Sequence, residues 1–128
     1  MKIKFYKYQG AGNDFVMIDD RHKNLKLSTV NINFLCDRHF GIGADGLIVL
    51  QNDEIADFKM VYYNSDGNES TMCGNGGRCL AQFAHDLNVK TNEMNFNAID
   101  GMHQAKILPN QVALQMIDVE KVENFEQY

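Results

Sequence analysis

The most constraining feature of this sequence is a two-residue alternation of apolar and polar side chains that recurs along most of its 128 residues. This period places successive side chains on opposite faces of an extended chain, so each such stretch predicts a β-strand. The last strand would close a hairpin across Pro109 and Asn110, a pair that favours turns. The strands that we expect are at residues 2–8, 15–19, 46–51, 57–64, 94–98 and 111–117.

The fourth of these strands carries large side chains on both faces. Phe58, Met60 and Tyr62 point one way, whereas Val61 and Tyr63 point the other. A strand that is apolar on both faces is typical of one buried on both sides. We therefore expect this strand to be covered on both sides.

Two segments depart from the alternation. Residues 28–38 begin with Ser28 or Thr29, and either side chain is a favourable helix cap. Residues 74–88 follow a helical period, because four apolar side chains recur at i, i+3, i+4 and i+7. These side chains are Leu80, Phe83, Ala84 and Leu87. A helix among so many strands predicts an α+β fold, with a mostly antiparallel sheet or incomplete barrel curled around that helix.

Charge and hydropathy exclude several classes of function. The formal net charge of −5, with no run of Lys or Arg, argues against a nucleic-acid partner. The longest strongly apolar run, residues 47–50, is far too short to span a bilayer, so we expect no membrane partner. The amino terminus lacks the apolar stretch of a signal peptide, and the three cysteines are therefore expected to remain reduced. These features predict a cytoplasmic protein.

Four loops are rich in Gly, Asn and Asp, which suggests that together they line a pocket. Glycine lets backbone N–H groups come close to a ligand. None of the loops has the spacing of a dinucleotide fingerprint, and no Gly-Lys-Ser/Thr sequence is present for a phosphate-binding loop. For each loop taken alone, a simple turn remains the alternative. The loops are residues 10–15, 41–46, 64–68 and 73–77.

Cys73 and Cys79 bracket the last of these loops. A helix that starts near Gly74 separates them by about 9 Å along its axis, whereas a disulfide needs Cα atoms within about 7 Å. Their spacing does not fit a zinc site either, so we expect no metal. Cys79 is better explained as core packing. Cys73 is either an ordinary buried thiol or a thiol whose pKa is lowered at the helix start, beside N–H groups suited to a carboxylate.

Three motifs, read in order, resemble the amino-terminal half of the diaminopimelate epimerase family. They are "GAGNDF", "RHFGIGADG" and "NSDGNESTMCGNGGRC", and the resemblance runs through most of the chain. It implies one of two similar domains of a cofactor-independent epimerase that interconverts LL- and meso-diaminopimelate for lysine and peptidoglycan precursors. The implied mechanism uses two cysteines, one removing the α-proton and the other delivering a proton to the opposite face.

The resemblance also implies roles for particular residues. Cys73 would be one of the two acid/base cysteines. Gly74 and Asn75 would offer N–H groups to the α-carboxylate at the reacting centre. Asn13 and Asn64 would hydrogen-bond polar groups of the substrate.

The sequence departs from the family pattern because it does not contain the partner cysteine. In the family that cysteine lies in a carboxy-terminal domain of similar size, and Cys79 cannot replace it from the same helix as Cys73. We therefore expect residues 1–117 to form one domain that is inactive alone. The acidic residues 118–128 would begin a linker to the missing domain, and a homodimer is among the expected assemblies. Gly46 is a smaller departure, since some relatives carry a polar side chain there.

Two other classes of protein compete with this interpretation. A proline racemase-like or phenazine-biosynthesis-like isomerase would share the fold, although the phenazine type replaces the cysteine with a carboxylate. A non-enzymatic module that binds small carboxylates at the helix start would need no second cysteine at all.

Overall fold

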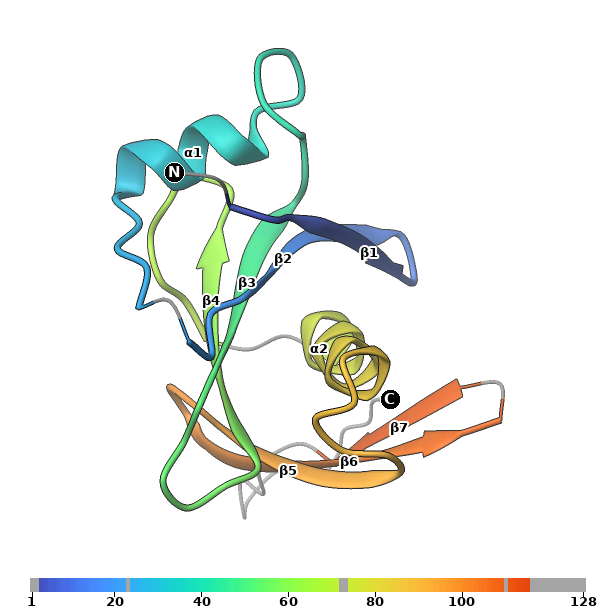
Figure 1. The fold of residues 1–128 in the computed structure, drawn as a ribbon. Helices are drawn as coiled ribbons and strands as arrows, with labels where there is room; N and C mark the ends of the chain where they lie inside the picture. The colour runs from blue at the N-terminus through green and yellow to red at the C-terminus, as the bar shows by residue number, and fades with distance from the viewer. Residues whose placement is uncertain (1–2, 23, 72–73, 110, 116–128) are drawn as a thin grey trace.

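The computed structural model describes residues 3–22, 24–71, 74–109 and 111–115, which form seven strands and two helices (Figure 1). In chain order these elements are β1 (Tyr6–Gly10), β2 (Asn13–Asp19), α1 (Thr29–Cys36), β3 (Gly46–Gln51), β4 (Phe58–Asn64), α2 (Gly74–Asp86), β5 (Glu93–Ala98), β6 (Gly101–Leu108) and β7 (Gln111–Gln115). The longer helix, α2, has 13 residues, and neither helix of the described part of the chain is long and apolar enough to cross a membrane.

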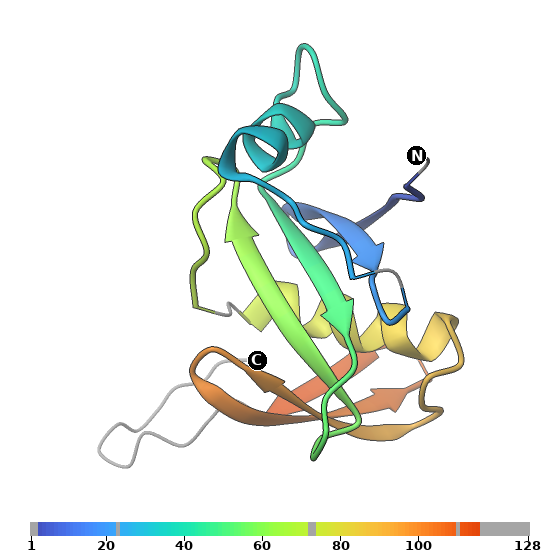
Figure 2. The same cartoon turned by 60° about the vertical axis from the view of Figure 1, so that its left-hand side comes forward.

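The strands form one sheet in which spatial order follows chain order from β1 to β7. Four of the six pairings are antiparallel, and two, β2 with β3 and β4 with β5, are parallel. Each parallel pair is joined by a long connection that carries a helix, as parallel neighbours require. The sheet curls so that β1 and β2 lie on one side of α2 and β5 to β7 on the other (Figures 1 and 2). The expected α+β fold, a curled and mostly antiparallel sheet around a central helix, is confirmed.

Helix α2 fills the inside of the curl. Leu80, Phe83 and Ala84 are fully buried there, as their spacing predicted. The rings of Tyr6 and Tyr8 lie against Phe83, with centroids 5.1 and 5.4 Å away. Aromatic pairs at these distances add to the stabilisation that burial of their area provides. The inner core therefore ties the first strand of the sheet to the central helix.

The end of α2 is set by Asn88, whose φ of 62° lies in the left-handed region. Asn88 N–H donates to the carbonyl of His85 at 3.0 Å, and Val89 N–H donates to that of Ala84 at 2.9 Å. This is a Schellman motif, which satisfies carbonyls that would otherwise lack partners at a helix end. The helix consequently stops at Asp86, two residues before the predicted boundary.

Helix α1 packs on the opposite side of the sheet, over a second core (Figure 2). Ser28 is its cap, and its Oγ accepts a hydrogen bond from Asn31 N–H at 3.0 Å. The carboxylate of Asp37 accepts hydrogen bonds from the N–H groups of His39 and Phe40, so the chain turns after Cys36 instead of continuing to residue 38. Because cores lie on both faces, β4 is covered on both sides, as predicted.

The first strand is shifted from its prediction. Ala11 and Gly12 both have positive φ, 51° and 91°, which is typical of a tight two-residue hairpin turn. Both strands therefore continue up to this turn, where Gly10 pairs with Asn13. The expected strand at 2–8 is therefore wrong at its beginning, where residues 3–5 are not in a strand, and it continues instead to Gly10.

The inner core generates a stability prediction. We expect Phe83→Ala to lower the free energy of unfolding by about 3–5 kcal/mol, because it removes a fully buried ring and leaves a cavity. Phe40→Ala is the matched control, since that ring is 78% exposed, and it should change stability by less than about 0.5 kcal/mol. Urea denaturation of both variants measures the difference. Equal losses would contradict the assignment of α2 to the core.

Candidate active site

The structure brings three of the predicted site residues together at the start of α2. Gly74 and Asn75 are the first two residues of this helix, and Asn13 is the first residue of β2. Asn75 Nδ2 donates a hydrogen bond to Asn13 Oδ1 at 2.7 Å. The helix start and the β1–β2 hairpin are thereby joined through two amides. Cys73, the predicted acid/base residue, lies outside the described residues and precedes Gly74 in the sequence.

Asn64, the fourth predicted substrate-binding residue that the structure describes, is the exposed last residue of β4. It pairs in register with Gly46, and Gly46 pairs with Phe15 on its other side. Asn64 therefore lies at the same end of the sheet as Asn13. Its carbonyl accepts from Gly67 N–H at 2.9 Å, within the turn that follows β4.

The glycine-rich loops meet at this end of the sheet for a topological reason. The hairpin turn precedes β2, the 41–46 loop leads into β3, the 64–68 turn follows β4, and Gly74 begins α2. Parallel pairing of β2 with β3 and antiparallel pairing of β3 with β4 place these ends side by side. The separate loops of the sequence are thus neighbours in space.

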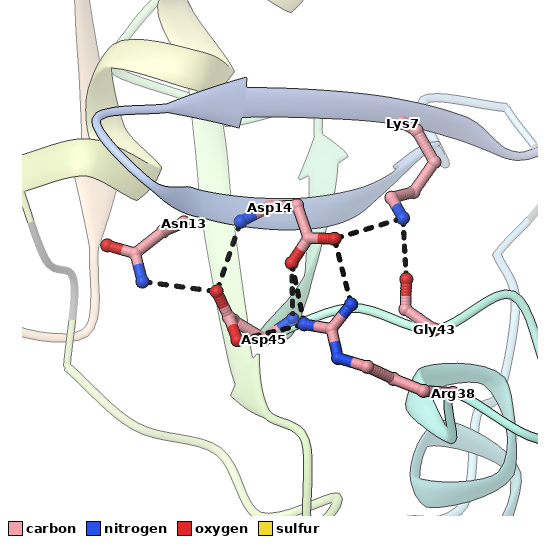
Figure 3. A network of polar contacts seen from close by, with 6 residues as sticks. All are labelled: Lys7, Asn13, Asp14, Arg38, Gly43 and Asp45. Atoms are coloured by element: carbon pink, nitrogen blue, oxygen red, sulfur yellow. Dashed lines mark hydrogen bonds and ion pairs between the residues drawn. The ribbon is translucent and has the colours of Figure 1, made fainter.

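A network of charges that the sequence analysis did not identify underlies this end (Figure 3). Arg38 donates to both carboxylate oxygens of Asp14, at 3.1 and 3.0 Å. Lys7 Nζ lies 3.1 Å from Asp14 Oδ2 and donates to the Gly43 carbonyl at 2.6 Å. A bidentate pair of this kind fixes geometry as well as adding energy. These contacts connect the loop after α1 to the β1–β2 hairpin.

Asp45 connects the network to the predicted site. Its Oδ2 accepts hydrogen bonds from Asn13 Nδ2 at 3.1 Å and from Asp14 N–H at 3.2 Å, while its Oδ1 accepts from Arg38 at 3.0 Å. Asn13 is consequently held from two sides, by Asp45 and by Asn75. The presence of Asp14 and Asp45 in two of the glycine-rich loops was the signal in the sequence.

The electrostatic environment keeps Asp14 and Arg38 ionised. Hydrogen bonds from the Arg38 guanidinium, opposed by burial and reinforced by Lys7, hold the pKa of Asp14 well below its ordinary value. The same pairing, chiefly the hydrogen bond to Asp14, raises the pKa of Arg38. The pair of Asp14 and Arg38 therefore stays charged throughout the neutral range.

Cys36 and Cys79, the two cysteines that the structure describes, are both buried, at 4% exposure each. Burial raises the pKa of Cys36 to about 11, so its thiol is protonated at neutral pH. Cys79 belongs to the inner core beside Gly10, where a Cβ on the glycine would come within 3.2 Å of its Sγ. Neither position suits a thiol that exchanges protons with a substrate.

A hollow in the surface lies elsewhere, over β5 to β7. Its lining includes Glu93, Lys106 and Leu114 and none of the predicted site residues. An open groove over a sheet is weaker evidence of a site than convergent polar groups. We therefore base the site on the amides and the helix start.

The curled sheet around a central helix is a fold that this chain shares with solved structures. A phenazine biosynthesis protein of the PhzF family from Bacillus anthracis superposes with a TM-score of 0.65 at 17% identity, over 84% of this chain and 36% of that chain. A hydroxyproline epimerase from Agrobacterium vitis, with trans-4-hydroxy-L-proline bound, superposes with a TM-score of 0.60 at 12% identity, over 89% and 41%. These likenesses define the fold class.

Sequence comparison identifies the family within that class. The family model described as diaminopimelate epimerase matches residues 5–122. The diaminopimelate epimerase of Flavobacterium psychrophilum is 60% identical over 128 residues, which is 98% of this chain and 50% of that protein. That of Synechococcus sp. strain JA-3-3Ab is 44% identical over 117 residues, covering 90% and 39%. The chain belongs to the diaminopimelate epimerase family, and it spans about half the length of the curated relatives or less.

The charge network generates a pH prediction. Because the pKa of Asp14 is lowered in the folded chain, its stabilisation is complete above the unfolded pKa of about 4 and is lost as the pH falls through the folded value. We expect Asp14→Asn to cost about 2 kcal/mol at pH 7 and progressively less below about pH 4.

Unfolding by urea at a series of pH values measures this difference. Glu93→Gln is the control, because its ion pair with Lys106 spans 3.7 Å between exposed side chains and should contribute less than about 1 kcal/mol. A cost of Asp14→Asn that did not change with pH would contradict the electrostatic account.

Proposed function

We propose that this chain is the half of a diaminopimelate epimerase that holds the substrate's α-carboxylate and supplies one of two acid/base cysteines. The observation that carries the proposal is the joining of Asn13 and Asn75 at the start of α2, beside Gly74. The membership in the diaminopimelate epimerase family supplies the substrate.

The start of α2 has the properties of a carboxylate site. The first N–H groups of a helix lack partners within the helix, and the helix dipole favours negative charge there. The first turn of α2 contains no acidic side chain that would compete for these groups. The N–H groups of Gly74 and Asn75 would therefore bind the α-carboxylate of the substrate.

In the proposed mechanism the Cys73 thiolate removes the α-proton and the electron pair of the broken C–H bond remains on the α-carbon. The N–H dipoles around the carboxylate stabilise the charge that develops, with no cofactor as an electron sink. A thiol on the opposite face then gives its proton to the carbon and becomes the thiolate. Asn13 and Asn64 would fix the substrate by hydrogen bonds to its polar groups.

A second domain is proposed to supply the opposing cysteine, since the chain spans about half the length of its relatives. Residues 1–117 would form one of two similar domains, and residues 118–128, outside the described part of the chain, would begin the connection. We place the reaction in the cytoplasm, where thiols remain reduced, and in the supply of lysine and peptidoglycan precursors. A homodimer of the complete protein is part of the same proposal.

Deuterium incorporation at the α-carbon of diaminopimelate tests the function. We expect no incorporation by the chain alone. We expect turnover when the chain is fused to the half of the Flavobacterium psychrophilum diaminopimelate epimerase with which it does not align. In the joined protein, Cys73→Ser should lower kcat by more than about 100-fold, because acid/base catalysis contributes that much or more. Cys79→Ser is the control and should retain activity, since its side chain packs in the core. Exchange by the chain alone, or the reverse ranking of the two variants, would contradict the proposal.

The reactivity of the Cys73 thiol distinguishes an enzyme from a carboxylate-binding module. We expect iodoacetamide to modify Cys73 near pH 7, because a thiol at a helix start has a pKa below about 8.5. Cys36 should remain unmodified in the folded chain, since it is buried and its pKa is about 11. Peptide mapping by mass spectrometry measures both. A Cys73 that is as inert as Cys36 would favour the carboxylate-binding module or a structural thiol.

A further inference from the structure

Arg78 lies one turn into α2, and its guanidinium folds back toward the start of the helix. Its Nη2 donates a hydrogen bond to Asn75 Oδ1 at 2.6 Å. A Cβ placed on Gly74 would lie 3.6 Å from Nη1 and 3.7 Å from Nη2. The guanidinium therefore contacts Asn75 and lies beside Gly74, where a side chain would meet it.

This position is electrostatically unfavourable for a cation. The amino-terminal end of a helix carries partial positive charge, so a guanidinium there opposes the helix dipole. Arg78 Nη1 is also buried and has no hydrogen-bond partner among the described residues. A buried donor without a partner costs free energy. Two unfavourable features at one side chain indicate that it serves the site and does not primarily stabilise the fold.

Hydrogen bonds to Arg78 and to Asp45 determine how the two site amides are oriented. A guanidinium can only donate, so the atom of Asn75 that faces Arg78 must be its oxygen. The Asn75 amide nitrogen must then donate to Asn13 Oδ1. At the other end, the carboxylate of Asp45 can only accept, so it faces Asn13 Nδ2. Arg78 and Asp45 thus leave a single arrangement of the two amides between them.

We propose that Arg78 is a positioning residue that holds the Asn75 amide in place, and thereby keeps the Asn75–Asn13 hydrogen bond and the donors that both amides present to the substrate. This proposal rests on the proposed function of the site. One N–H of each amide is used within the series Arg78–Asn75–Asn13–Asp45, and among the described residues the second N–H of each remains available as a donor. Donors in fixed positions suit the oxygen atoms of a carboxylate substrate.

Nuclear magnetic resonance of the chain tests the positioning without any turnover. In Arg78→Met, which removes both the donor and the charge, we expect the side-chain amide signals of Asn75 and of Asn13 to shift. In this series of hydrogen bonds Arg78 is bonded to Asn75 and not to Asn13. A shift of the Asn13 signal would therefore show that the effect of the substitution passes through Asn75. Arg78→Lys keeps a donor and a positive charge, and it should restore most of both signals.

Arg21→Met is the matched control. Arg21 is also partly buried and forms a bidentate pair, with Asp19 at 2.8 Å through both nitrogens, on a different part of the sheet. Its loss should lower stability without moving the amide signals of Asn13 or Asn75. An Asn13 signal that does not move in Arg78→Met, or that moves equally in Arg21→Met, would overturn the proposal.

Kinetics of the joined protein test the consequence for substrate. We expect Arg78→Met to raise KM for meso-diaminopimelate by about tenfold to a hundredfold, the range produced by loss of one charge-assisted hydrogen bond, with a smaller effect on kcat. Arg78→Lys should recover most of the change, and Arg21→Met should leave KM unaltered. An unchanged KM in Arg78→Met would overturn the proposed role. A joined protein without turnover would instead overturn the proposed function. The amide signals of Asn13 and Asn75 would still show whether Arg78 positions the two amides.

Discussion

The burial of α2 inside the curled sheet is the constraint on which the rest of the structure depends. Its apolar face contacts β1 and β2 on one side and β6 and β7 on the other, so the helix holds together strands from both ends of the sheet. The same burial fixes the position of the helix start relative to the β1–β2 hairpin. The contact between Asn75 and Asn13 is therefore a consequence of core packing, and any movement of α2 would separate the two amides.

The elements that the sequence predicted well are those whose pattern is set by burial. The bounds of β3 match its prediction, because apolar side chains cover both of its faces. The start of α2 matches because the glycines ahead of its apolar period mark the beginning of the helix. By contrast, β6 was not predicted, since one of its inward positions is occupied by His103, which is 2% exposed and paired with Asp100 at 2.9 Å. A polar side chain on the core face removes the apolar signal of a strand.

For the candidate site, the sequence indicated residues whose roles stay predictions, and it did not indicate the contacts between them. Sequence motifs indicated Asn13 and Asn75 separately, but the two residues lie 62 positions apart, so nothing local in the sequence indicates that they are in contact. Their hydrogen bond depends on the parallel pairing of β2 with β3, which α1 connects, and on the position of α2 inside the sheet. Both depend on contacts between residues far apart in the sequence. The roles of Arg38 and Arg78 were hidden for the same reason. A charged side chain has no periodicity that identifies its partner, so the ion pairs emerge only once the loops are adjacent in space.

The electrostatics of this end of the molecule differ from those of the whole chain. The net charge of −5 would repel a carboxylate group at long range. Near the site, however, the carboxylates of Asp14 and Asp45 form ion pairs with Lys7 and Arg38. Among the described residues, no acidic side chain pairs with the start of α2 or with the Arg78 guanidinium. Attraction of a carboxylate must then come from groups in contact with it. Contacts of this kind are screened by salt much less than long-range fields, so recognition at the helix start does not require an overall positive charge.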